Sequence, residues 1–155
     1  MVAQAGTRLG GAWIADGTVW FVEGRPSENG RVVLMKRAPG EDPVDAVPAD
    51  FNVRTLVHEY GGGMFTIHDG TVFCSRFEDQ RLYRIDPDEP PAAITPEVER
   101  RRHRYADGRV TPSGELWIGV RGRHPESGHP VEVVNELVVL PTDGSSEPRV
   151  IAGGR

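Results

Sequence analysis

The segment IADGTVWF, residues 14–21, sets the pattern of the chain because it returns twice further along. It reappears as IHDGTVFC at residues 67–74 and more loosely as TPSGELWI at residues 111–118. The turn glycines Gly17, Gly70 and Gly114 are separated by 53 and 44 residues, which is close to the repeat length of propeller blades. The Asp-Gly pairs supply the positive φ that two-residue hairpin turns require. The sequence therefore predicts three similar β units.

Further strand-like runs recur in the same order within each unit. Apolar runs follow the turn strands at residues 31–37, 81–86 and 135–141, and short strand-like segments follow at residues 44–47, 92–95 and 149–152. Together with the strand before each turn, these runs give four strands per unit, as in a propeller blade. We therefore predict an all-β fold: a partial β-propeller of about three four-stranded antiparallel blades, with approximate bounds 1–50, 51–97 and 98–155.

One connection departs from this pattern. The sequence PEVERRRHR, residues 96–104, favours a single helical turn that begins at Pro96 with Thr95 as its N-cap. Its basic run could contact nucleic acid phosphates, but the nearby glutamates and the shortage of stacking aromatic residues favour a solvated loop.

Composition excludes several classes of function. The 155 residues carry a formal net charge of −5, which argues against a nucleic acid partner. Cys74 is the single cysteine; it cannot form an internal disulfide and is expected to be a small buried residue in a reducing compartment. No apolar run approaches membrane-spanning length. We therefore expect a cytoplasmic protein with no membrane partner.

The strongest candidate site lies in FNVRTLVHEYGGG, residues 51–63. His58, Glu59 and Tyr60 stand directly before three consecutive glycines, and a predicted strand, MFTI, follows. A glycine triplet beside a polar cluster indicates close backbone approach or unusual φ and ψ angles, and strand ends often carry sites. We predict that these three side chains bind substrate. A β-bulge or packed corner, with the same side chains in structural hydrogen bonds, explains the pattern equally well.

Other catalytic and metal motifs are missing from the sequence. No G-x-S-x-G elbow is present, so no catalytic residue is assigned. His58 and Glu59 do not form a zinc-protease motif, because Gly62 stands where the second histidine would be. His124 and His129 flank a loop, but their spacing is not diagnostic of a metal site. We predict neither a metal nor a cofactor.

Charged residues near the strands are predicted to serve the fold. Arginines at positions 25, 76, 81 and 121 are expected to pair internally with acids such as Glu28, Glu78 and Asp79. The pairs Asp79-Gln80 and Asn135-Glu136 stand at comparable places in their repeats. We expect them to form hydrogen bonds from one blade to the next.

Several motifs in order give a family resemblance. They are EGRPSENGRVVL (23–34), FNVRTLVHEYGGG (51–63), DQRLYRID (79–86), RYADGRVTPSG (104–114) and VVNELVVLPTDG (133–144). Over nearly its whole length the chain resembles the N-terminal propeller of prolyl oligopeptidase-family serine peptidases, in the dipeptidyl or acylaminoacyl peptidase branch. The resemblance implies a cytosolic peptidase whose propeller controls access to a C-terminal α/β-hydrolase domain that carries Ser, Asp and His. That hydrolase domain is absent from this chain.

The function that follows is a non-catalytic propeller portion that gates or orients peptide substrates. In such a propeller Glu59 is the candidate to contact the amino terminus of a peptide. The sequence leaves open whether this chain has any enzymatic activity. It favours a fragment of a larger peptidase, because three blades do not close a propeller. The alternative is a free-standing binding module for a protein or small ligand, and copies could associate through exposed blade edges.

Overall fold

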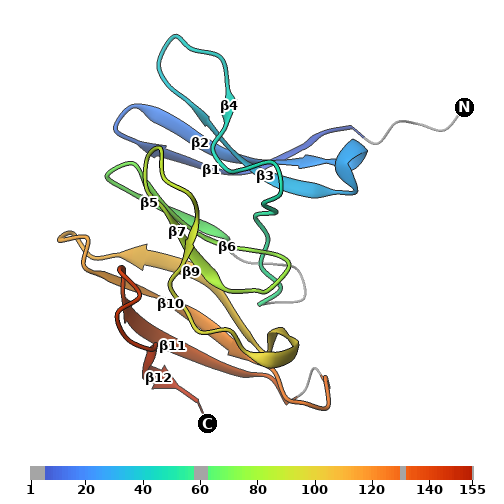
Figure 1. Ribbon diagram of the computed structural model, residues 1–155, viewed down its shortest axis with the longest axis vertical. Helices are drawn as coiled ribbons and strands as arrows, with labels where there is room; N and C mark the ends of the chain where they lie inside the picture. The colour runs from blue at the N-terminus through green and yellow to red at the C-terminus, as the bar shows by residue number, and fades with distance from the viewer. Residues whose placement is uncertain (1–5, 58–62, 130–131, 155) are drawn as a thin grey trace, which may run out of the picture. The chain divides into compact units, whose positions relative to one another are not determined.

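The computed structural model describes residues 6–57, 63–129 and 132–154. Within these residues the fold is almost entirely β, with three four-stranded antiparallel sheets and two short 3-10 helices (Figure 1). This confirms the predicted fold class, a partial propeller of three four-stranded blades. The chain divides into two compact units, one ending at Val53 and the other beginning at Arg54, and each is described separately. No helix in the described part is long and apolar enough to cross a membrane.

The first unit is a single sheet in the order β1-β2-β3-β4. Its strands are β1 (Arg8–Ala15), β2 (Thr18–Arg25), β3 (Arg31–Arg37) and β4 (Val44–Asp45), and the 3-10 helix η1 (Pro26–Glu28) lies between β2 and β3. Asp16 and Gly17 form the β1–β2 turn with φ of 49° and 76°, as the Asp-Gly pair predicts. Asn29 and Gly30 also have positive φ and lead into β3.

The core of the first unit lies along β3. Val33 and Leu34 are fully buried there. After β4 the chain runs back beside the same strand, since the Val53 amide donates to the Val32 carbonyl at 2.8 Å and the Val32 amide donates to Asn52 Oδ1 at 2.9 Å. Phe51 is 2% exposed, and its amide donates to the Pro48 carbonyl at 3.0 Å. The first part of the FNVRTLVHEYGGG segment is therefore structural.

The second unit contains two sheets, β5-β6-β7-β8 and β9-β10-β11-β12. The 3-10 helix η2 (Glu99–Arg101) lies in the connection between them. The strands are β5 (Phe65–His68), β6 (Thr71–Ser75), β7 (Leu82–Ile85), β8 (Ala92–Ala93), β9 (His103–Val110), β10 (Leu116–Arg123), β11 (Val134–Pro141) and β12 (Arg149–Gly153). The predicted apolar runs coincide with β7 and β11, while β4 and β8 are shorter than predicted.

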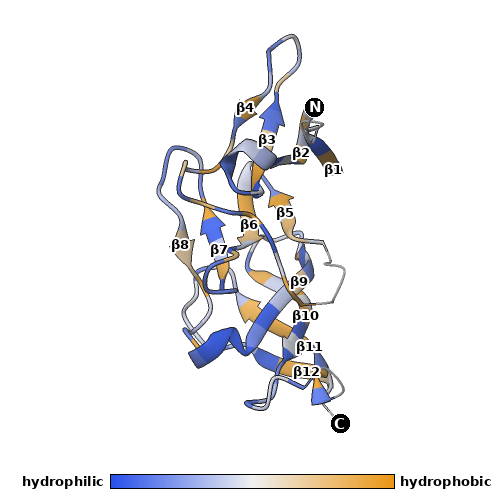
Figure 2. Cartoon of the chain, turned by 90° about the vertical axis from the view of Figure 1, so that its right-hand side faces the viewer, coloured by the Kyte–Doolittle hydropathy of each residue, from blue (hydrophilic) through white to orange (hydrophobic). Residues whose placement is uncertain are grey.

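A shared core joins the two sheets of the second unit. Figure 2 shows hydrophobic residues along β5 and β6, and the buried cluster consists of Phe73, Leu82, Ile94, Tyr105, Trp117, Val138 and Leu140. Trp117 requires two glycines beside it: a Cβ at Gly108 or Gly119 would lie 2.2 or 2.3 Å from its ring atoms. Any larger residue at either position would displace the indole.

Hydroxyl groups connect β5 and β6 to β9. Thr66 Oγ1 donates to the Gly108 carbonyl at 2.6 Å, and Ser75 Oγ donates to the Tyr105 carbonyl at 2.7 Å. The pairing between β9 and β10 is irregular at this point, where the register shifts between Ile118 and Val120. A bulge interrupts the ladder and leaves backbone groups for other partners. The buried hydroxyls supply partners for two of the β9 carbonyls.

The predicted helical turn at Pro96 is wrong. Thr95 is buried, and its hydroxyl accepts a hydrogen bond from the Leu82 amide of β7 at 3.0 Å. The 3-10 helix begins later, at Glu99, after an extended Val98. Within it Arg100 has a φ of 56°, which breaks helical geometry.

Candidate functional site

The predicted substrate-binding residues, His58, Glu59 and Tyr60, lie outside the described residues, as do Gly61 and Gly62. The prediction of their role therefore stays a prediction. The structure does describe both flanks of this segment, Val57 on one side and Gly63 on the other. The two flanks show how the fold positions the ends of the candidate segment.

Gly63 forms the downstream anchor. Its amide donates to Asp107 Oδ1 at 2.7 Å, and the Asp107 amide donates to the Gly63 carbonyl at 2.8 Å. A Cβ at Gly63 would lie 2.9 Å from the same carboxylate oxygen. The third glycine is therefore needed for close approach to β9, as the glycine triplet indicates. Asp107 itself has a φ of 54° and is exposed.

Gln80 forms the upstream anchor together with β9 and β10. Its side chain is fully buried, with Oε1 accepting from the Leu56 amide at 2.7 Å and Nε2 donating to the Arg54 carbonyl at 3.3 Å. Arg104 Nη1 donates to the Leu56 carbonyl at 3.0 Å. Val57 is 3% exposed and lies against Gly122, where a Cβ would meet its Cγ2 atom at 3.1 Å. The chain is thus fixed up to the residue before His58.

The expected blade-to-blade role of the Asp79-Gln80 and Asn135-Glu136 pairs is wrong. Gln80 bonds to residues 54 and 56, within its own predicted blade, and Asp79 accepts from the Tyr83 hydroxyl at 2.6 Å. Glu136 on β11 pairs with Arg121 on the neighbouring β10 at 2.7 Å. Bonds between the two sheets of the second unit include those from the Thr66 and Ser75 hydroxyls to β9 carbonyls and from the Arg84 guanidinium to the Thr142 carbonyl at 3.3 Å.

Internal pairing of the arginines is confirmed for several of them. Arg25 contacts Glu23, Glu28 and Asp45. Its hydrogen bonds to Asp45 hold the pKa of that carboxyl below its ordinary value. The other pairs are Arg76 with Glu78 and Arg121 with Glu136. Arg81 differs from the expectation, since its guanidinium donates to the Thr95 carbonyl at 2.8 Å.

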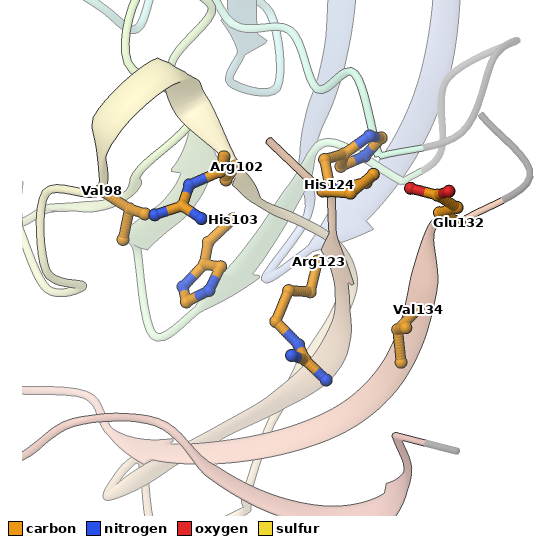
Figure 3. Close-up of a pocket in the computed structure, with 8 residues that line it drawn as sticks. Val98, Arg102, His103, Arg123, His124, Glu132 and Val134 are labelled. Atoms are coloured by element: carbon orange, nitrogen blue, oxygen red, sulfur yellow. The ribbon is translucent and has the colours of Figure 1, made fainter. Parts of the chain in front are cut away.

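A separate pocket of about 300 Å³ lies in the second unit, between the start of β9 and the β10–β11 connection. Figure 3 shows Arg102 and His103 on one side, Glu132 and Val134 on the other, and Arg123 and His124 between them. Val98 and Pro125 also line it. The pocket combines positively charged and apolar side chains.

Register brings two Arg-His pairs of the sequence together. His103 on β9 stands opposite Arg123 on β10, and the His124 amide donates to the Arg102 carbonyl at 2.7 Å. The sequence analysis missed this pocket, because it interpreted the basic run as a solvated loop. The repeated dipeptide Arg-His, at residues 102–103 and 123–124, is the signal that could have found it.

The field in the pocket is positive. Burial lowers the pKa of His103, and the charges of Arg121, Arg123 and Arg102 lower it further, opposed by Glu136. Burial and the charge of Arg104 lower the pKa of His124. Both imidazoles are therefore neutral at pH 7. His124 Nε2 is buried without a hydrogen-bond partner in the described part of the structure.

The described residues contain no group of three or more His, Cys, Asp or Glu side chains that could hold a metal ion. His124 lines the basic pocket described above. The Glu132 carboxylate accepts from the Ser127 hydroxyl at 2.8 Å. The polar groups that line the pocket are the guanidinium groups of Arg102 and Arg123, the imidazoles of His103 and His124 and the carboxylate of Glu132.

Comparison with solved structures identifies the fold and its relatives. A puromycin-hydrolyzing peptidase of Mycobacterium tuberculosis matches 95% of this chain at 30% identity and a TM-score of 0.83. Puromycin hydrolase matches 97% at 28% identity and a TM-score of 0.84, and a serine-to-alanine mutant of puromycin hydrolase complexed with PGG matches at 29% identity and 0.85. No family model and no curated protein matches the sequence.

The match covers 24% to 25% of each peptidase, so this chain spans about a quarter of their length. It corresponds to an N-terminal part of them, and its three sheets are the blades expected of a propeller. The resemblance found in the sequence is confirmed: the chain has the structure of the N-terminal propeller part of a prolyl oligopeptidase-family peptidase.

Proposed function

We propose that this chain is the non-catalytic propeller portion of a serine peptidase and gates or orients peptide substrates for an α/β-hydrolase domain. The observation that carries the proposal is the match of nearly the whole chain to about a quarter of the chain in three solved structures, one of a puromycin-hydrolyzing peptidase and two of puromycin hydrolase. The absence of a G-x-S-x-G motif from the sequence agrees with a role outside the chemical step. We also propose that the protein works in the cytoplasm.

The proposed contact with substrate is made by His58, Glu59 and Tyr60. A carboxylate such as that of Glu59 suits the protonated amino terminus of a peptide. The anchors at Val57 and Gly63 support this proposal, because they fix both ends of the segment against β9 and β10. A short segment held at both ends loses less entropy when a ligand binds to it.

Calorimetric titration of the 155-residue chain tests this role. The ligands are a tripeptide with a free amino terminus and the same tripeptide with an acetylated amino terminus. We expect the free-amine peptide to bind more tightly. Glu59→Gln should weaken its binding about tenfold, which corresponds to about 1.4 kcal/mol for one charge-assisted hydrogen bond.

Glu97→Gln is the matched control, since it makes the same change of residue type at an exposed position of the second unit that does not line the pocket. It should leave both affinities unchanged. Equal affinities for the free and acetylated peptides, or a Glu59→Gln variant that binds like the wild type, would contradict the proposal.

A second candidate function is a binding module that associates with copies of itself. The last sheet favours this alternative, because Leu116, Leu137, Val150 and Ile151 on β10, β11 and β12 are exposed. β12 is also an edge strand, and unpaired edges promote association. Light scattering during size-exclusion chromatography decides the point: a discrete dimer supports this function, and a monomer at all concentrations excludes it.

A further inference from the structure

We propose that the pocket between β9 and the β10–β11 connection binds the carboxylate of a small amphipathic ligand, with Arg102 and Arg123 as the binding cations. A peptide carboxyl terminus and an acidic side chain next to an apolar residue share this chemistry. Neither the comparisons nor the substrate-orienting role proposed above assigns a ligand to this pocket. This inference and the substrate-orienting role are tested independently, because they rest on different residues.

The size and lining of the pocket suit such a ligand. Its volume of about 300 Å³ lies at the small end of ligand-binding sites. Val98, Pro125 and Val134 supply apolar surface, and Arg102 and Arg123 supply charge. Sites of this kind bind an apolar body while a few polar groups fix its orientation. A carboxylate attached to one apolar side chain fits both features.

The two arginines have hydrogen-bonding capacity to spare. Among the described residues, the Arg102 guanidinium pairs with Glu126 at 3.3 Å, and the Glu126 side chain is 77% exposed. Arg123 reaches Glu136 only at 3.4 Å, whereas Arg121 holds the same carboxylate at 2.7 Å. A guanidinium has five N–H donors and prefers bidentate carboxylate partners. A bound carboxylate would therefore give Arg102 and Arg123 a closer partner than Glu126 and Glu136 do.

The arginines of the pocket favour an anion over a cation. Three positive charges act on His103: Arg102, the residue after η2, and Arg121 and Arg123 on β10. The opposing negative charge is that of Glu136 on β11. Glu132 is the acid in the pocket lining, and it is bound to Ser127. A bound carboxylate would offset this positive field and raise the pKa of His103. The titration midpoint of His103 therefore shows whether a carboxylate is bound in the pocket.

Nuclear magnetic resonance titration of the full 155-residue chain tests the inference. N-acetyl-leucine carries the carboxylate, and N-acetyl-leucinamide is the matched ligand without it. We expect saturable shifts of the His103 and His124 ring signals with the acid, a higher His103 titration midpoint when it is bound, and no saturable shifts with the amide. Equal responses to both ligands, or no response to either, would overturn the proposal.

Two further ligands define the chemistry. N-acetyl-leucyl-aspartic acid α-amide, with a side-chain carboxylate and no terminal one, distinguishes the two carboxylate sources: tighter binding than N-acetyl-leucine assigns an acidic side chain, and weaker binding assigns a carboxyl terminus. Either result supports a carboxylate site. Inorganic phosphate that binds as tightly as either carboxylate would overturn it, because the apolar lining would then contribute nothing.

Variants identify the binding cations. Arg102→Gln and Arg123→Gln should each weaken N-acetyl-leucine binding at least fivefold, while the remaining backbone amide signals keep their positions and show that the fold is intact. Arg100→Gln is the control: Arg100 lies on η2, is exposed and does not line the pocket. An Arg100→Gln effect as large as that of the other two would mean that general surface charge attracts the ligand, and the proposal would fail.

Discussion

Replacing Gln80 by leucine should release the segment that leads into the candidate site. The Gln80 side chain is fully buried and holds the Leu56 amide at 2.7 Å, the Phe77 carbonyl at 3.0 Å and the Arg54 carbonyl at 3.3 Å. Leucine keeps most of the volume and removes these three bonds together with a longer one from Nε2 to the Arg76 carbonyl at 3.5 Å. One orphaned buried donor costs about 1–3 kcal/mol and each lost net hydrogen bond about 0.5–1.5 kcal/mol. We expect a loss of about 2–4 kcal/mol.

Hydrogen exchange at the Leu56 amide measures this loss locally. A change of 2–4 kcal/mol corresponds to exchange about 30- to 1000-fold faster, at about 1.4 kcal/mol per factor of ten. Glu78→Leu is the control, because Glu78 is an exposed side chain of the same loop, and surface changes usually stay within about 0.5 kcal/mol. A Gln80→Leu chain whose Leu56 amide exchanges less than threefold faster would refute the assignment of Gln80 as the upstream anchor.

Three more predictions concern the fold. Gly108→Ala places a Cβ 2.2 Å from Trp117 Nε1 and should destabilise the second unit by about 1–3 kcal/mol; an unchanged melting temperature by circular dichroism would count against this packing. Burial raises the pKa of the Cys74 thiol, so an aromatic disulfide reagent at pH 8 should label it only in urea, and rapid labelling of the native chain would disprove its burial. Arg25 lowers the pKa of the Asp45 carboxyl, so their pairing stabilises the first unit above pH 3.8, the ordinary aspartate pKa, and this stabilisation is lost as the pH falls through the lower pKa of the folded state. Carbon NMR should show that the titration midpoint of Asp45 rises in Arg25→Gln. An unchanged midpoint would contradict the pairing.

The repeated turns were predictable because their chemistry is local. Asp16, Asp69 and the three turn glycines, Gly17, Gly70 and Gly114, all have positive φ in the structure. Such backbone angles are favourable for glycine and tolerated by aspartate, so the residue types alone indicate the turns. With the strand runs between them, the turns were enough to predict three four-stranded sheets.

What the sequence did not reveal depends on contacts between distant residues. Thr95 looks like a helix cap, but the Leu82 amide occupies its hydroxyl. In the basic pocket the β9–β10 register sets His103 opposite Arg123, and the repeated Arg-His dipeptide does not by itself encode that register. The role of Gly63 was predictable in part. The glycine triplet indicated a close backbone approach, but only the structure identifies Asp107 as the neighbour.

The most direct test of the proposed function is equilibrium dialysis of the 155-residue chain against a peptide with a free amino terminus, read by mass spectrometry. A non-catalytic, substrate-orienting propeller portion predicts that the peptide accumulates on the protein side, that acetylation of its amino terminus lowers this accumulation, and that every recovered molecule is intact. Equal concentrations on both sides would contradict substrate orientation, and recovered cleavage products would contradict a non-catalytic role.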